Sequence, residues 1–147
     1  MPSRKRLKSV CHSIAHHSVS GLSYLHPHAL RSCRDLGICY LRFSLLSSDP
    51  CPLEFSHFGP LRSALRTLSD TFREILGSEG FTPDSLTSAT MLILPDNQCL
   101  DDHCTTAHCE ITTTDGAHYE SAVNYMGHSV HVPAVAREAR VSESLHT

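Results

Sequence analysis

Two alternating segments around a short polar turn constrain the fold of this chain more than any other feature. Residues 105–113 and 117–125 alternate apolar and polar side chains, as strands with one buried face do. Between them stands Thr114-Asp115-Gly116, and an Asp-Gly pair is typical of a tight turn between antiparallel strands. The sequence therefore predicts a β-hairpin here.

The register of this hairpin depends on the length of its turn. A two-residue turn would place Ile111 opposite Glu120. A three-residue loop, with Gly116 in the left-handed region, would place Ile111 opposite Tyr119 and Ala107 opposite Val123. Only the longer loop brings apolar side chains together on one face, so we predict that register.

The predicted register gathers four ionisable side chains on the other face of the hairpin. His108 and Glu110 belong to the first strand, and His118 and Glu120 to the second, because residues two apart point the same way. Glu110 then lies directly opposite Glu120. Like charges in that position destabilise a sheet, so a proton, an imidazolium, a cation or water must relieve the repulsion.

A divalent metal is one answer to this repulsion. Two histidines and two glutamates on one rigid face suit zinc, manganese or iron. We therefore take His108, Glu110, His118 and Glu120 as candidate metal ligands, with zinc or another divalent metal as the cofactor. The alternative interpretation is two His–Glu ion pairs on a solvated sheet face.

Two other groups of candidate ligands are weaker. Cys99, His103 and Cys104 could meet if residues 99–104 form a loop, although their spacing is not that of a standard zinc finger. His12 and His16 lie one helical turn apart, but next to lysines that would repel a cation. We expect this second pair to be exposed and without a metal.

Two segments have the apolar spacing of amphipathic helices, residues 3–25 and 60–76. In the first, apolar or small side chains recur at Leu7, Val10, Cys11, Ile14, Ser18, Leu22 and Leu25. In the second, one stripe contains Leu61, Leu65, Leu68, Phe72, Ile75 and Leu76. Each helix therefore has one face that must pack against another element.

Two further strands are expected at residues 38–46 and 86–94, on either side of the second helix. Strand, helix and strand in series predict a right-handed crossover between parallel strands, if both strands share a sheet. The fold class is therefore α+β: a two-layer domain with a mixed sheet of about four strands and two main helices packed on one face. The side chains expected to face the helices are Cys39, Leu41, Phe43, Ile111 and Tyr119.

The length of 147 residues suits one domain. We place that domain at residues 1–132 and expect a short helix or a frayed tail at 133–147. Seven cysteines without a regular framework or an export signal indicate reduced thiols and a cytoplasmic location. The basic, acid-free N-terminus also imitates a mitochondrial presequence, which is the alternative.

No motif in the sequence names an activity. No apolar run is long enough for a membrane helix, and the basic residues Arg4–Lys8 lack the interleaved aromatics of many nucleic-acid-binding surfaces. We expect a small intracellular binding or regulatory module, with a protein partner or a second copy on the sheet face. The alternative is a metal-dependent hydrolase or related enzyme that uses the four-residue cluster.

Overall fold

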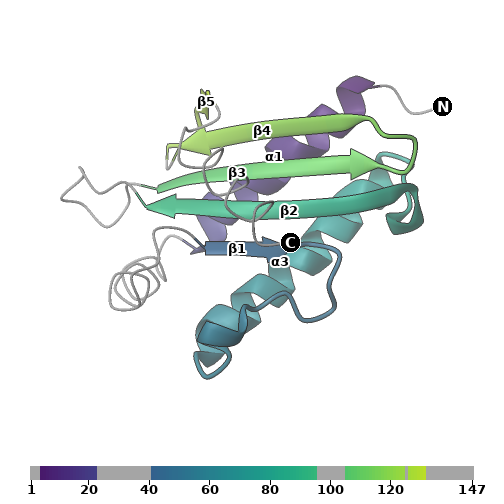
Figure 1. The fold of residues 1–147 in the computed structure, drawn as a ribbon. Helices are drawn as coiled ribbons and strands as arrows, with labels where there is room; N and C mark the ends of the chain where they lie inside the picture. The colour runs from purple at the N-terminus through teal and green to yellow at the C-terminus, as the bar shows by residue number, and fades with distance from the viewer. Residues whose placement is uncertain (1–3, 23–40, 96–104, 125, 132–147) are drawn as a thin grey trace, which may run out of the picture.

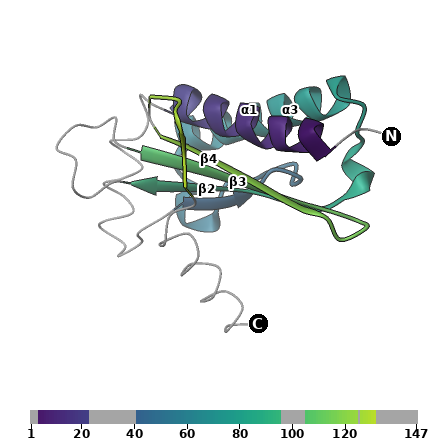
Figure 2. The ribbon, with the colours of Figure 1, turned by 90° about the horizontal axis from the view of Figure 1, so that it is seen from above.

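The computed structural model describes residues 4–22, 41–95, 105–124 and 126–131. In this part of the chain, five strands form one sheet and two helices cover one of its faces (Figures 1 and 2). The elements in chain order are α1 (Arg4–Leu22), β1 (Leu41–Ser44), η1 (Leu53–Phe55), α3 (Gly59–Ser78), η2 (Pro83–Ser85), β2 (Leu86–Pro95), β3 (Thr105–Thr113), β4 (His118–Asn124) and β5 (Ser129–Val130). The order of strands across the sheet is the same as their order in the chain.

Within the described residues, the two helices bury most of the stripes that their sequences predicted. On α1 the buried side chains include Leu7, Val10, Cys11, Ile14 and Ser18. On α3 they include Leu61, Leu65, Leu68, Phe72 and Leu76. Both stripes join the helix-facing side chains of the sheet in one hydrophobic core. The predicted two-layer α+β class is confirmed, with five strands instead of about four.

The predicted mixed sheet is wrong, because every pair of neighbouring strands in the described sheet is antiparallel. In β1, Leu41 lies opposite Ile93 and Ser44 lies opposite Thr90. Strand β2 therefore begins near the end of the sheet at which β1 stops. A parallel crossover would have brought β2 in from the opposite end.

The segment between β1 and α3 explains this direction. This segment runs antiparallel to α3, from the C-terminal part of the helix toward its N-terminus, and α3 then runs back in the other direction. Arg73 donates a hydrogen bond of 2.9 Å from Nη2 to the carbonyl of Leu46, and the Ser69 hydroxyl donates one of 2.8 Å to the carbonyl of Leu45. Nearer the start of α3, Arg62 forms an ion pair with Asp49. The chain thus returns to the end from which it left.

The hairpin of β3 and β4 has the predicted register. Ile111 lies opposite Tyr119, and Ala107 opposite Val123. Gly116 has φ = +91°, the left-handed conformation that the three-residue loop requires. The Thr113 N–H donates a hydrogen bond of 2.9 Å to the carbonyl of Ala117 and closes the loop. This register determines which side chains of the hairpin point away from α1 and α3.

Several sequence predictions lie outside the described residues. These are the orientation of Cys39, the loop with Cys99, His103 and Cys104, and the helix or tail at 133–147. No helix of the described chain is long and apolar enough to cross a membrane.

Candidate metal site

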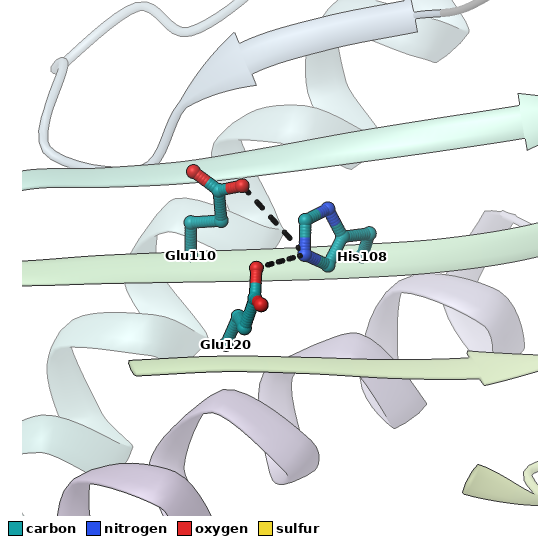
Figure 3. A group of neighbouring side chains, drawn as sticks. All are labelled: His108, Glu110 and Glu120. Carbon is teal, nitrogen blue, oxygen red and sulfur yellow. Dashed lines mark hydrogen bonds and ion pairs between the residues drawn. The ribbon is translucent and has the colours of Figure 1, made fainter. Parts of the chain in front are cut away.

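The alternation of β3 separates its side chains between the two faces of the sheet. Cys109 and Ile111 point to the helices and belong to the core. His108 and Glu110 therefore point to the opposite face of the sheet, away from α1 and α3. Strand β4 brings Glu120 to the same face, directly opposite Glu110. The close-up in Figure 3 shows these three side chains gathered on the hairpin.

One nitrogen of the His108 imidazole approaches both carboxylates (Figure 3). This nitrogen, Nε2, is 3.2 Å from Oε2 of Glu120, within hydrogen-bond distance, and 3.7 Å from Oε1 of Glu110 (Figure 3). The contact to Glu120 joins the two strands diagonally, because His108 lies opposite Ala122, two residues from Glu120. Of the three side chains, His108 is only 2% exposed, Glu110 12% and Glu120 34%. The group is therefore buried at His108 and reaches water at Glu120.

These three side chains satisfy the simplest requirement of a metal site. One ligand atom from each of His108, Glu110 and Glu120 can be chosen so that all lie within 4.8 Å of one another. One imidazole nitrogen and two carboxylate oxygens form a donor set that suits zinc, manganese or iron. A nitrogen binds a metal through its lone pair, so a metal ion at Nε2 would replace any proton on that nitrogen.

His118, the fourth predicted ligand, does not join this group. Its Nδ1 is 3.1 Å from the hydroxyl of Thr112, the residue opposite it on β3. Its Nε2 is 3.9 Å from the Glu120 carboxylate, which is an ion-pair distance but not a hydrogen bond. The side chain is 44% exposed. The structure thus brings together three of the four predicted residues and leaves His118 beside them.

The sheet face that points away from α1 and α3 contains the His–Glu ion pairs of the alternative interpretation, but it is partly buried and not wholly solvated. Leu92 on β2 and Ala122 on β4 lie on either side of His108 in the sheet, and they are 5% and 3% exposed. A signal for this burial exists in the sequence. Residues 91–94 are a continuous apolar run, which is typical of a strand that is covered on both faces.

The other histidines of the described chain lie elsewhere. His12 is half-buried and His16 is exposed, with ring centroids 6.3 Å apart on α1. His57 and His128, which could have added ligands from other elements, are both exposed. Among the residues that the structure describes, the group of possible ligands contains none of these four.

Comparison with known proteins adds no functional assignment. No model of a known protein family, no curated protein and no solved structure matches this chain. The functional interpretation therefore depends on the side-chain geometry.

Proposed function

We propose that this protein is a small binding or regulatory module that holds a divalent metal ion through His108, Glu110 and Glu120. The observation that carries the proposal is the convergence of three ligand atoms within 4.8 Å on one face of a rigid hairpin. Zinc is the first candidate, and manganese or iron the next, because all three accept imidazole and carboxylate ligands.

The charge of the group supports a divalent cation. Glu110 and Glu120 are directly opposed on adjacent strands, where two negative charges repel. Glu110 is 12% exposed, so water screens its charge little. A divalent ion bound to both carboxylates would offset both charges.

The alternative function is a metal-dependent hydrolase or related enzyme at the same cluster. Such a site usually combines groups from several elements around a place for substrate. In the described part of the chain, the three gathered ligands all come from the β3–β4 hairpin, and His57 and His128 are outside the group. No observation therefore favours this alternative over a binding role.

We also propose a cytoplasmic location for this module and a sheet face that can bind a partner. Cys11, Cys51 and Cys109 are free thiols in the structure, which suits a reducing, cytoplasmic location. Among the residues that the structure describes, the helices cover only one face of the sheet (Figure 2), and a protein partner or a second copy could use the other face. Light scattering of the purified chain would distinguish a monomer from a dimer.

Elemental analysis and thermal melts of the untagged protein test the metal proposal. Purified protein should contain about one divalent ion per chain or acquire it from added zinc or manganese. Added metal should then raise the melting temperature, since a ligand that binds only the folded state stabilises it. A chelator should reverse that shift.

Two matched variants locate the ion. Glu120→Gln removes a proposed ligand and should abolish the metal-dependent shift in melting temperature. His118→Gln changes an equally polar neighbour outside the group and should keep the shift. If neither metal nor chelator moves the melt of the wild type, the cluster is a structural ion pair and the proposed function is wrong.

A further inference from the structure

The candidate metal site has fewer protein ligands than the ions proposed for it accept. Within the described chain, the group of possible ligands has three members, His108, Glu110 and Glu120. Zinc takes at least four ligands, and a site with three protein ligands keeps a position for water or another molecule. Manganese, which is commonly octahedral, has more such positions. An ion held by these three side chains therefore also binds a ligand from solution.

The exposure of the side chains shows from which side that ligand can approach. On β3, His108 is 2% exposed and Glu110 12%. On β4, Glu120 is 34% exposed and His118 44%. The site is thus closed toward β3 and open to water along β4. A ligand from solution reaches the ion most easily beside Glu120 and His118.

His118 is oriented so that it can contact such a ligand. Its Nδ1 is 3.1 Å from the Thr112 hydroxyl, and its Nε2 is 3.9 Å from Oε2 of Glu120. The same oxygen is 3.2 Å from Nε2 of His108. The Thr112 hydroxyl can donate to Nδ1, and the Glu120 carboxylate is an acceptor near Nε2, so the ring proton belongs on Nε2. His118 therefore presents an N–H donor beside the site without being one of its ligands.

We propose that the metal-loaded protein binds a small oxyanion, such as a carboxylate, through the ion and the N–H of His118. The proposal rests on the metal site proposed above. One oxygen of the anion binds the ion, and a second oxygen accepts a hydrogen bond from Nε2 of His118. The Glu110 and Glu120 carboxylates balance the charge of a divalent ion, but without the ion they repel an anion. Binding of the anion therefore requires the metal.

Cobalt(II) and acetate are suitable probes for this oxyanion site. Cobalt(II) binds the same nitrogen and oxygen ligands as zinc, and its visible absorption changes when a ligand in its coordination sphere changes. The untagged full chain is loaded with cobalt and titrated with sodium acetate, while sodium perchlorate, a very weak ligand, keeps the ionic strength constant. Acetate should change the cobalt spectrum in a saturable way. Calorimetric titration of the metal-free protein with acetate should show no binding.

Two histidine variants separate the oxyanion site from the metal site. His118→Ala should bind cobalt as the wild type does, but its affinity for acetate should fall about tenfold, because a hydrogen bond to a charged acceptor is lost. His57→Ala changes an exposed histidine outside the ligand group and should keep the wild-type affinity.

The outcomes that contradict the two proposals differ. If cobalt binds but acetate leaves its spectrum unchanged, the oxyanion site is excluded and the metal site remains. The same conclusion follows if His118→Ala binds acetate as tightly as the wild type, or if the metal-free protein binds it equally well. If the wild type binds no cobalt, zinc or manganese, both sites are excluded.

Discussion

Nε2 of His108 on β3 lies 3.2 Å from Oε2 of Glu120 on β4, and this contact joins the two hairpin strands on the face away from the helices. The histidine end is buried, and the glutamate end is one-third exposed. A second carboxylate, that of Glu110, lies 3.7 Å from the same nitrogen. A single imidazole nitrogen therefore lies near two acidic groups that the register places opposite each other.

Removal of the His108 imidazole should destabilise the protein, because the Glu110 and Glu120 carboxylates would then lose an interaction partner that they share. We expect His108→Ala to lower the free energy of unfolding by about 3 kcal/mol in the presence of chelator, the low end for breaking a buried ion pair. In a Glu110→Gln, Glu120→Gln background the same change should cost clearly less. Urea denaturation of the four proteins measures this coupling. Equal losses in both backgrounds would show that His108 contributes only its packing.

Phe72 should be among the most sensitive core positions. Its side chain is fully buried on the sheet-facing stripe of α3. Phe72→Ala should lower the free energy of unfolding by about 3–5 kcal/mol, because it removes apolar contacts and leaves a cavity. Ser63→Ala on the exposed side of the same helix should change it by less than about 0.5 kcal/mol. A loss below about 1 kcal/mol for Phe72→Ala would contradict the observed packing.

Gly127 allows α1 to approach the turn between β4 and β5. Its φ is +82°, and a Cβ at this position would lie 2.5 Å from Nε2 of His16. Gly116 has φ = +91° but has no atom within 4 Å of such a Cβ. Gly116→Ala should therefore cost only the backbone strain, about 1–2 kcal/mol. Gly127→Ala should cost up to about 1 kcal/mol more, since the His16 ring must turn away.

The substitution His16→Ala tests whether the His16 ring causes the difference in stability between the Gly127→Ala and Gly116→Ala variants. In its background, Gly127→Ala and Gly116→Ala should destabilise the protein equally. Denaturation midpoints of the single and double variants give the comparison. Equal effects already in the wild-type background would mean that His16 does not restrict the turn.

Asp49 should keep its charge to a lower pH than an ordinary aspartate. Hydrogen bonds from Arg62, of 3.3 Å from Nε and 2.5 Å from Nη2, lower the pKa of Asp49 below its ordinary value of 3.8. A carboxyl group whose pKa is lowered by folding adds stability above the unfolded value and loses it as the pH falls through the folded value. The contribution of this pair should therefore begin to fall below about pH 4 and be lost below the lowered pKa of Asp49.

An NMR titration of the Asp49 carboxyl carbon measures this directly. Arg62→Gln should return the pKa of Asp49 toward its ordinary value, because it removes the first cause of the shift. The pair is exposed on both sides, so salt should weaken the effect as well. A titration curve that is the same in wild type and Arg62→Gln would exclude the pair as the cause.

Local patterns determined the helices, the hairpin and the composition of the candidate site. The turn at Gly116 and the alternation of its flanking strands were sufficient for the register, since a shift by one residue would expose Ile111. That register in turn placed Glu110 opposite Glu120 and His108 diagonal to Glu120. Neighbours within a hairpin follow from short-range geometry, which a sequence contains.

Only the tertiary structure decided the relationships between distant segments. The direction of β1 depends on how the segment after it runs along α3, and the spacing of apolar residues does not specify that path. The separation of His118 from the ligand group depends on its rotamer and on its contact with Thr112. The contact of the Cys11 thiol with the carbonyl oxygen of Tyr119 depends on where α1 lies over the sheet. Periodicity shows which face of an element is buried, whereas the docking of complete surfaces selects the partners on that face.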